Sequence, residues 1–320
     1  AMAILIREEE VHDLLPMSDA LTAVEEVFRI KGNGKADNRP RQRPRLERAM
    51  LQVMPGAVTG MGLGLKAYTV TPKGVRFVVL LWDDESGELL AMIEANELGS
   101  IRTGASSGVA TKYLARQDSR TVGIFGSGFQ AFTQLEAVSE VREIGAVYVY
   151  GRSEAKRRSF AERASDRLKI DVSAVERPQE CAACDIVITI TNAADPVFAG
   201  GMVTEGAHIN AAGSNRAEAA EIGGDTLERA GRIVVDDLQQ AKGEAGDLIR
   251  AVSEGRLAWE RVEELAAIVA GRAPGRSSAS EITLFESLGI AIEDIAVARR
   301  VYDNALKRGA GERLPKSILG

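Results

Sequence analysis

The segment VGIFGSGFQA, residues 122–131, decides the fold. An apolar run, 122–125, precedes the glycines and an amphipathic stretch, 129–141, follows them, so the pattern predicts a strand, a tight turn and a helix. In that arrangement Gly126 makes the turn, Gly128 lets the backbone approach a pyrophosphate, and Ala131 allows close packing. Free N–H groups at the start of the helix then point at the phosphates. The segment therefore predicts a dinucleotide site. The residues of the turn that are predicted to bind the dinucleotide are Gly126, Ser127, Gly128, Phe129, Gln130 and Ala131.

The sequence around this turn alternates between apolar and amphipathic segments. Charged segments such as 154–168 and 217–230 have the length of covering helices. Residues 280–306 favour a pair of helices interrupted near Gly289. The alternation is typical of a doubly wound parallel sheet, whereas a lone glycine turn is weak evidence for one. The predicted strands are 122–125, 147–150, 171–175, 186–191, 208–212 and 233–235.

The first 120 residues follow a different plan, typical of a mixed α+β lobe. Ser18 or Asp19 is predicted to begin a helix that residues 31–34 end. In strand 63–70 the two-residue period places Lys66 on the face opposite Leu63 and Leu65, so Lys66 is expected to point away from that apolar layer. The other expected elements are strands 50–54, 77–82 and 89–94, a hairpin turn at 83–87 and a helix at 96–115.

Charge and hydropathy narrow the classes of partner. The chain carries a formal net charge of −6 and has an isoelectric point near 5.3. Nucleic acids and anionic membrane surfaces attract basic proteins, so neither is expected as a partner. No apolar run reaches the roughly 20 residues of a membrane-spanning helix, and no basic segment with an apolar core behind it opens the chain. We expect a cytoplasmic protein that acts on a small molecule.

The cysteines and histidines do not form a metal-binding pattern. Cys181 and Cys184 have C-x-x-C spacing, but no second cluster of Cys or His completes a tetrahedral zinc site. The pair also precedes an expected strand instead of opening a helix after one, so two buried thiols are favoured over a redox pair. Neither His12 nor His208 has metal-ligand spacing, and His208 is expected to be a hydrogen-bonded structural residue. No metal is predicted.

The end of the second strand of the α/β part bears on the form of the cofactor. An NAD site usually places Asp or Glu against the ribose hydroxyl about 20 residues after the glycine turn. Here no acid stands at the strand end, and Arg152, Ser153 and Arg157 are candidates to hold a 2′-phosphate. The sequence therefore favours NADP(H), with NAD(H) as the alternative. A competing interpretation is that Ser153 caps the next helix and the basic residues form its solvated face.

Segments along nearly the whole chain resemble the ornithine cyclodeaminase and mu-crystallin family of nicotinamide-dependent proteins. They are Arg39-Pro40-Arg41, Val53-Met54-Pro55, Leu65-Lys66, Gly87-Glu88-Leu89, Ile101-Arg102-Thr103, the glycine turn, Thr191-Asn192, residues 206–213, Gly246-Asp247 and residues 283–289. The resemblance implies a Rossmann dinucleotide-binding domain at 119–292. It also implies a mixed α+β substrate-binding and dimerisation domain, formed by 1–118 with 293–320, and a homodimer.

The resemblance assigns roles to individual residues. In the family, an arginine before the Met-Pro segment, the lysine of the central strand and the arginine of the Arg-Thr helix surround the substrate carboxylate. These positions match Arg41, Lys66 and Arg102. A forked guanidinium suits a carboxylate because it holds both oxygens. Close to Arg41, an exposed basic run is the competing interpretation, and it contains Arg39, Arg43 and Arg45. The cofactor contacts implied by the resemblance are Thr103, Thr191 and Asn192.

One position departs from the family pattern. Cyclodeaminases place an aspartate after the Gly-x that follows the fifth strand, whereas this chain reads Gly213-Ser214-Asn215. An amide does not accept a proton at neutral pH, so a general-base role is lost here, and reduction of an imine requires less of this position. Asn215 stays a candidate substrate-site residue, with a cap of the following segment as its competing interpretation.

The resemblance and this departure together favour an NAD(P)H-dependent reductase of a small, cyclic α-imino acid such as Δ1-pyrroline-2-carboxylate, which yields the L-amino acid. The alternatives are ornithine cyclodeaminase, an alanine-type amino acid dehydrogenase, and a non-enzymatic NADPH- or ligand-binding protein similar to mu-crystallin. Lys66, Arg102 and Arg41 are the predicted catalytic residues.

Overall fold

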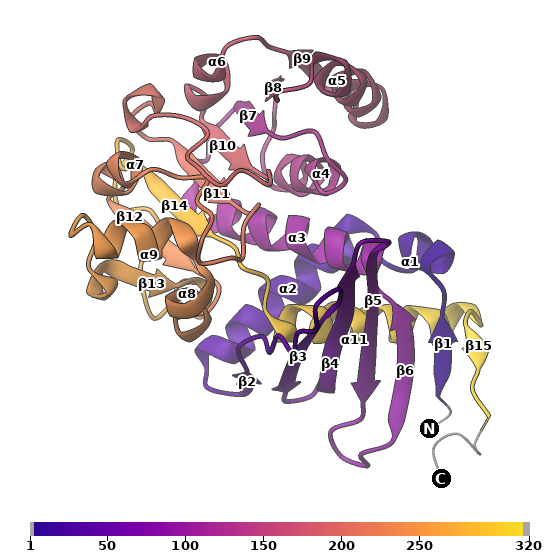
Figure 1. Cartoon of the computed structure of the whole chain (residues 1–320). Coiled ribbons are helices and arrows are strands. Elements are labelled where there is room, and N and C mark those ends of the chain that lie inside the picture. Colours follow the sequence, from indigo (N-terminus) through magenta and orange to yellow (C-terminus); the bar gives the residue numbers. More distant parts are fainter. Residues whose placement is uncertain (1–2, 316–320) are drawn as a thin grey trace. The chain divides into compact units, whose positions relative to one another are not determined.

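The computed structural model describes residues 3–315, which form two compact units (Figure 1). The first unit comprises the chain up to Arg102 and from Ile290 onward, and the second is Thr103–Gly289. These limits differ from the predicted boundaries at 118/119 and 292/293. Helix α3 (Asn96–Leu114) continues unbroken past Arg102. Its second half belongs to the second unit, where Gln134 Nε2 donates to the Thr103 carbonyl and Asn210 Nδ2 donates to Thr111 Oγ1.

Within the described residues, the first unit holds a mixed seven-stranded sheet in the order β15-β1-β6-β5-β4-β3-β2. Helix α11 packs on β3, β4 and β5 and also against α2 (Figure 1). The strands are β1 (Ile4–Ile6), β2 (Ala36–Asn38), β3 (Met50–Val58), β4 (Gly62–Thr71), β5 (Gly74–Trp82), β6 (Leu89–Glu94) and β15 (Glu312–Arg313). The helices are α1 (Glu8–Leu14), α2 (Met17–Gly32) and α11 (Ala291–Arg308), together with the first turns of α3. Helix α1 was not predicted, and α2 begins one residue before the expected cap.

The alternation predicted for strand β4 is present, but the covered face of the sheet is the one that carries Lys66. Only 3% of Lys66 is exposed, whereas 44% of Leu63 is exposed. Helix α11 comes this close because the facing strands carry glycine: a Cβ at Gly64 would lie 2.9 Å from Ile295 Cγ1. The expectation that Lys66 points away from Leu63 and Leu65 is therefore confirmed, but the face of Lys66 is the packed one, since α11 covers it.

The second unit is built on a parallel sheet in the order β13-β12-β14-β11-β10-β7-β8-β9 (Figure 1). The strands are β7 (Thr121–Phe125), β8 (Ala146–Tyr150), β9 (Asp171–Ala174), β10 (Ile186–Thr189), β11 (His208–Ala211), β12 (Arg232–Val235), β13 (Val262–Glu264) and β14 (Thr283–Glu286). The helices are α4 (Ala131–Val141), α5 (Glu154–Leu168), α6 (Pro178–Ala182), α7 (Gly224–Arg229), α8 (Leu238–Glu244), α9 (Gly246–Ser253) and α10 (Leu265–Val269), with short 3₁₀ turns η1 (Gly200–Met202) and η2 (Trp259–Arg261). The predicted fold class, a Rossmann-type domain with a mixed α+β domain, is confirmed.

Two predicted helices of the second unit are wrong in part. Thr283–Glu286 is the strand β14, which pairs with β11 on one side and β12 on the other, so only the second half of 280–306 is helical. A strand buried on both faces shows no alternation that would separate it from a buried helix. The segment 217–230 is mostly loop and becomes helical only at Gly224.

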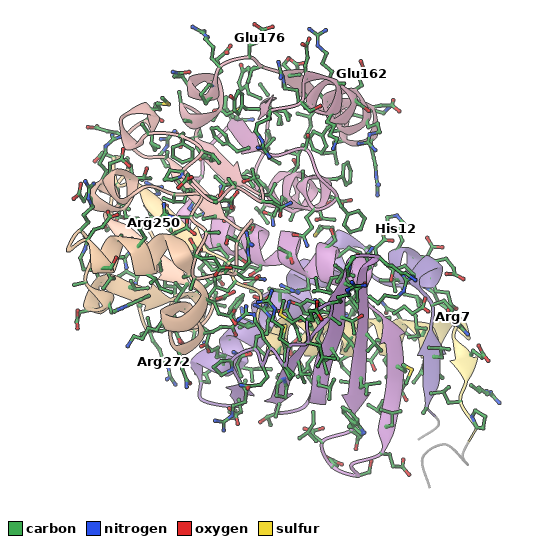
Figure 2. All side chains as sticks on the ribbon, in the orientation of Figure 1. Arg7, His12, Glu162, Glu176, Arg250 and Arg272 are labelled. Atoms are coloured by element: carbon green, nitrogen blue, oxygen red, sulfur yellow. The ribbon has the colours of Figure 1, made fainter. Side chains whose placement is uncertain are left out.

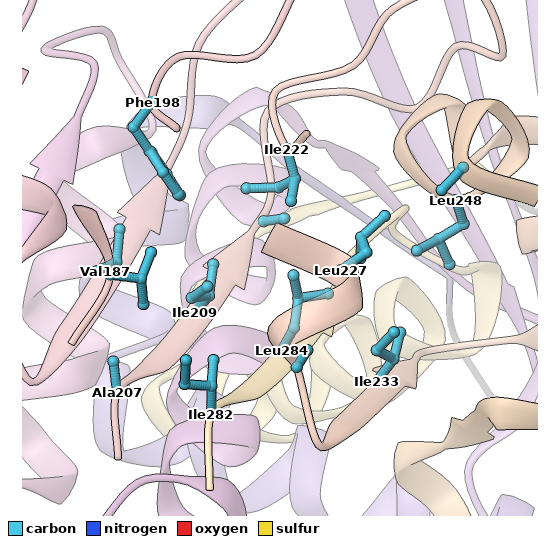
Figure 3. Close-up of a cluster of buried hydrophobic side chains, with 14 of the residues drawn as sticks. Val187, Phe198, Ala207, Ile209, Ile222, Leu227, Ile233, Leu248, Ile282 and Leu284 are labelled. Carbon is cyan, nitrogen blue, oxygen red and sulfur yellow. The ribbon is translucent and has the colours of Figure 1, made fainter. Parts of the chain in front are cut away.

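The core of the second unit fills both sides of this sheet. Ile209 of β11 and Leu284 of β14 lie among side chains of the covering segments, such as Phe198 and Leu227 (Figure 3). Charged side chains such as Glu162 and Glu176 point outward (Figure 2). Among residues 3–315, no helix has the length and hydropathy needed to cross a bilayer. Most charged side chains are exposed, and a charged side chain buried in such a core requires a partner of opposite charge or a hydrogen bond.

Candidate functional site

A cluster of buried charges lies between β4, α3 and α11 of the first unit. Lys66 Nζ donates to Asp294 Oδ1 at 3.0 Å, and Arg102 Nε donates to the same oxygen at 3.0 Å. Arg102 Nη1 also donates to Glu293 Oε2 at 3.1 Å. All four side chains are at most 8% exposed. The structure therefore brings together the lysine and the helix arginine that were predicted to hold a carboxylate.

Arg41 joins this cluster from the segment before β3. Its Nε lies 3.2 Å from Met54 Sδ, and Met54 pairs with Lys66 in the register of β3 and β4. Of the four arginines that the sequence left open, Arg41 is the buried one, with 6% exposure. Arg39 is exposed and pairs with Asp37. We name Arg41, Lys66, Arg102, Glu293 and Asp294 the cationic cluster, because it contains three cations and two carboxylates.

Lys66 is held in an environment that weakens its hold on a proton. Burial lowers its pKa to about 8, the charges of Arg102 and Arg41 act in the same direction, and Asp294 opposes them. Helix α3 leaves room for the ammonium because a Cβ at Gly99 would lie 2.9 Å from Nζ. The Phe77 ring lies beside it, with its centroid 5.3 Å from Nζ. A lysine with this pKa releases and regains a proton near neutral pH.

The two carboxylates of the cluster were missed in the sequence. Asp294 remains ionised: burial opposes the charge, but Arg102 and Lys66 lower its pKa below the ordinary value. Its Oδ2 has no hydrogen-bond partner among the described residues. Glu293 and Asp294 stand in the first turn of α11. Two acids at the start of a helix are common for electrostatic reasons, so the sequence alone carried no signal of their role.

A second row of side chains adjoins the cluster on the same face of the sheet. Tyr68 lies two residues from Lys66 on β4, and its hydroxyl donates to Gln52 Oε1 at 2.6 Å. The Tyr68 ring contacts Phe77, with centroids 4.8 Å apart. Gln52 is 8% exposed. This row gives the cationic cluster a wall that is largely apolar and carries a few polar groups, as in small-molecule sites. The two-residue period and the strand register were the signals that could have identified it.

The glycine turn in the second unit fits a dinucleotide. Gly126 has φ of +113°, and a Cβ there would lie 2.4 Å from the Ile190 carbonyl oxygen, so only glycine is accommodated. A Cβ at Gly128 would meet nothing within 4 Å, which leaves open space over the backbone. Helix α4 then begins at Ala131 without a side-chain cap, since Gln130 makes no capping bond. The turn thus has the two features that bind a pyrophosphate in this fold.

The other predicted cofactor residues differ in their contacts and in their exposure to solvent. The end of β8 lies beside it, since Gly126 N donates to the Tyr150 carbonyl at 2.9 Å. Ser153 accepts from Lys156 N at 3.4 Å and caps α5, as the competing interpretation expected. Arg157 Nη1 donates to the Gly151 carbonyl, and Arg152 is exposed. Of the two arginines predicted to hold a 2′-phosphate, Arg152 is thus the exposed one.

Thr103 and Thr191 are held by protein contacts, and Asn192 is exposed. The Thr103 carbonyl accepts from Gln134 of α4. Thr191 donates through both its N–H and its hydroxyl to Glu221. Asn215 is partly buried, and the segment after it is irregular until α7 begins at Gly224.

The remaining candidates have structural surroundings. Cys181 and Cys184 are free, buried thiols, and burial raises the pKa of both, to about 12 for Cys184. His208 is fully buried between Thr283 Oγ1 at 2.9 Å and Asn210 Oδ1 at 3.2 Å. Burial lowers its pKa to about 3, so it is neutral at physiological pH. The described residues contain no group of three or more His, Cys, Asp or Glu suited to a metal ion.

The chain is similar in sequence to a known protein family and to characterised reductases. The ornithine cyclodeaminase/mu-crystallin family matches residues 2–309. A Δ1-pyrroline-2-carboxylate reductase of Bacillus cereus is 40% identical over 272 residues, which cover 82% of this chain and 83% of that protein.

Two solved structures are similar over the whole chain. Thermococcus litoralis Δ1-pyrroline-2-carboxylate reductase in complex with NADH and L-proline has 37% identity and a TM-score of 0.93, covering 97% of this chain and 100% of its own. An archaeal alanine dehydrogenase dimer with bound NAD has 38% identity and a TM-score of 0.93, covering 99% and 100%.

Proposed function

Because the chain belongs to the ornithine cyclodeaminase/mu-crystallin family, we propose that it reduces the C=N bond of a small, cyclic α-imino acid such as Δ1-pyrroline-2-carboxylate to the L-amino acid with NAD(P)H. The observation that carries this proposal is the cationic cluster of the first unit. The relatives support the reaction class, since two of them are named Δ1-pyrroline-2-carboxylate reductases.

The cationic cluster suits the carboxylate of an imino acid. It holds three buried cations, Arg41, Lys66 and Arg102. Guanidinium and ammonium groups attract a carboxylate and donate hydrogen bonds to it, so the cluster favours an anionic ligand. The guanidinium groups of Arg41 and Arg102 hold both carboxylate oxygens in one plane, which orients the imine carbon for attack.

Reduction of an imine needs a hydride at carbon and a proton at nitrogen. The nicotinamide, when bound, supplies the hydride. Lys66 supplies the proton from Nζ, because with a pKa of about 8 it is mostly protonated at pH 7 and yet not strongly basic. Asp294 accepts hydrogen bonds from Lys66 and Arg102 and so fixes both head groups. In this account Asp294 is a positioning residue, and Lys66 is the catalytic acid.

For the cofactor we propose NADP(H), held at the 2′-phosphate by Arg152. The exposed guanidinium of Arg152 and the lack of an acid at the end of β8 support this choice. NAD(H) is the second candidate, because the solved relatives hold NADH and NAD. Equilibrium binding of NADPH and NADH, followed by their fluorescence, decides between the two.

A second candidate activity is reductive amination of a 2-oxo acid, favoured by the similarity to an alanine dehydrogenase. It shares the carboxylate site and the reduction of an imino acid. Ornithine cyclodeaminase chemistry is disfavoured because Asn215 cannot act as a general base. A non-enzymatic binding role is disfavoured by the lowered pKa of Lys66, about 8, which suits proton transfer and is not needed for binding alone.

We also propose a homodimer through the open face of the first unit's sheet. Side chains on that face of β3 and β4 include Leu51, 40% exposed, and Leu63, 44% exposed. Large apolar side chains on an uncovered sheet face are typical of an interface. The archaeal alanine dehydrogenase is a dimer. Light scattering should give twice the chain mass, and Leu63→Asp should shift it toward the monomer.

The test of the activity is oxidation of NADPH and NADH with Δ1-pyrroline-2-carboxylate, with the product analysed for L-proline. Parallel reactions contain pyruvate with ammonia, or ornithine with a catalytic amount of NAD. Formation of L-proline from the cyclic imine supports the proposal. Ammonia released from ornithine without net change of the cofactor contradicts it.

A further inference from the structure

Glu221 is a buried glutamate whose two oxygens each accept two hydrogen bonds. Oε1 accepts from Thr191 N at 2.7 Å and Thr191 Oγ1 at 2.6 Å. Oε2 accepts from Gly213 N at 2.8 Å and Thr189 Oγ1 at 3.1 Å. The residue is 1% exposed and lies in the segment before α7. Such saturation of one carboxylate fixes its donors in place.

The four donors come from the ends of two neighbouring strands. Thr189 ends β10 and Thr191 follows it, while Gly213 follows β11, and the two strands are parallel partners. Ligands bind at the carboxyl ends of strands in open α/β sheets. Thr191, Asn192 and Asn215 are the proposed site residues of these two loops. The contacts of Glu221 therefore tie together the loops that carry them.

The packing around the carboxylate leaves no room for a side chain at Gly213. A Cβ there would lie 2.3 Å from Glu221 Oε2 and 2.5 Å from the backbone N and O of Thr191. The glutamate's own backbone is bonded as well, since its carbonyl accepts from Val197 N at 2.9 Å. Glu221 thus links three loop segments of the second unit.

We propose that Glu221 is a positioning residue for the nicotinamide cofactor, which fixes the loops after β10 and β11 in the conformation that binds it. The inference rests on the proposed function only in that the second unit binds NAD(P)H. It concerns Glu221 itself, which no sequence pattern had singled out. The glutamate does not need to touch the cofactor, because it acts through Thr191 and Gly213.

The charge state of Glu221 offers a readout. Burial raises its pKa to about 7, while the bonds from Thr191 and Thr189 lower it. The ionisable groups that act on it are the carboxylates of Asp247, at the start of α9, and Glu286, at the end of β14, and Asp236 after β12 acts in turn on Glu286. The ionised form accepts all four hydrogen bonds, whereas the acid must turn one of them around. Cofactor affinity should therefore rise as the pH increases through about 7.

The experiment measures the Kd of NADH by fluorescence between pH 5.5 and 8.5 for the full chain and for Glu221→Gln. The Gln amide keeps the shape but presents an NH₂ group to one of the two loops. We expect Kd at pH 8 to rise about tenfold, the size of one lost hydrogen bond to a charged group, and the pH dependence to disappear. Hydrogen exchange at 191–197 and 213–220 should increase. Glu218→Gln, an exposed neighbour, should change none of these.

A second variant keeps the test decisive if Glu221→Gln does not fold. Thr189→Val removes one hydroxyl donor, so Kd should rise about threefold and the pH midpoint should move upward, because that bond lowers the pKa of Glu221. An unchanged Kd in both variants, or the same pH dependence in Glu221→Gln, overturns the inference. Glu221-dependent NADH binding without reduction of any imino acid would support it and contradict the proposed function instead.

Discussion

Each unit of this chain buries a cluster of charged side chains, and the two clusters balance charge in different ways. The cationic cluster of the first unit pairs opposite charges. The second unit groups four acids, Glu221, Asp236, Asp247 and Glu286, here named the carboxylate cluster. Asp247 accepts from Ile222 N, and Asp236 accepts from Leu288 N and Gly289 N. Burial raises the pKa of Glu286 well above its ordinary value, which favours its protonated form.

The difference separates two uses of buried charge. A cluster that gathers three cations attracts an anion such as a carboxylate. A cluster of acids that bind backbone N–H groups has no capacity left for an anion, and it fixes loops instead. The comparison therefore supports the two proposals, substrate binding by the first cluster and positioning of the cofactor loops by the second.

The largest expected effect comes from removing the cation at the centre of the first cluster. Lys66→Met should lower kcat/KM for the imino acid about a thousandfold, because both a carboxylate contact and the proposed proton donor are lost. The Kd of NADH should not change. Lys112→Met, at an exposed lysine of α3, is the control and should behave like the unmodified protein. Normal turnover by Lys66→Met would show that the first cluster is not the site.

Removing the carboxylate of Asp294, which accepts hydrogen bonds from both Lys66 and Arg102, tests how this acid controls the pKa of Lys66. Asp294 raises the pKa of Lys66, so Asp294→Asn should lower that pKa below about 8 and move the alkaline limb of the kcat/KM profile about one unit toward acid. Activity at pH 8 should fall about tenfold or more. Asp303→Asn, on the same helix, is the control. If the rate falls but the alkaline limb of the kcat/KM profile stays in place, Asp294 has only a structural role.

The carboxylate cluster predicts an unusual dependence of stability on pH. Glu221 binds its proton more tightly in the folded chain, with a pKa of about 7 against 4.5, so its contribution is present below pH 4.5 and lost as the pH rises through 7. A shift of this size corresponds to about 3 kcal/mol. Tm should fall between pH 5 and 7.5, and Glu221→Gln should flatten the curve. A Tm that rises over this range in both proteins would contradict the prediction.

The smallest effect concerns an exposed charge outside both clusters. Arg152→Ala should raise the Kd of NADPH about tenfold and leave that of NADH within about twofold, because only NADPH carries the 2′-phosphate. Arg158→Ala, an exposed arginine of α5 that pairs with Glu154, is the matched control. Equal losses for both cofactors would remove Arg152 from the 2′-phosphate site.

The fold was predictable to the extent that its strands alternate with covering helices. The glycine turn and the strand before it fixed the parallel sheet, because Gly126 takes a φ of +113° that other residues rarely adopt. Strand β14 was missed because a strand buried on both faces has no two-residue period. Its place between β11 and β12 follows from pairing across long sequence separations, which local patterns do not encode.

The candidate site was predictable in its cations but not in its acids. A family resemblance pointed to Lys66 and Arg102, yet the burial of Lys66 depends on α11, whose Asp294 lies 228 residues further along the chain. Glu221 stood in a segment whose charges indicated a helix, and only the fold brings it to the ends of β10 and β11. Solvent exposure and pKa are properties of such contacts.

The most direct test of the account compares kcat/KM for Δ1-pyrroline-2-carboxylate and for Δ1-pyrroline, the same cyclic imine without its carboxylate, by oxidation of NADPH or NADH. If the cationic cluster binds the carboxylate, the ratio should exceed about a thousand, and Lys66→Met should lower it, because one of the three cations is lost while Arg41 and Arg102 remain. Similar rates for the two imines, with a ratio that Lys66→Met leaves unchanged, would contradict the central claim that this cluster holds the substrate.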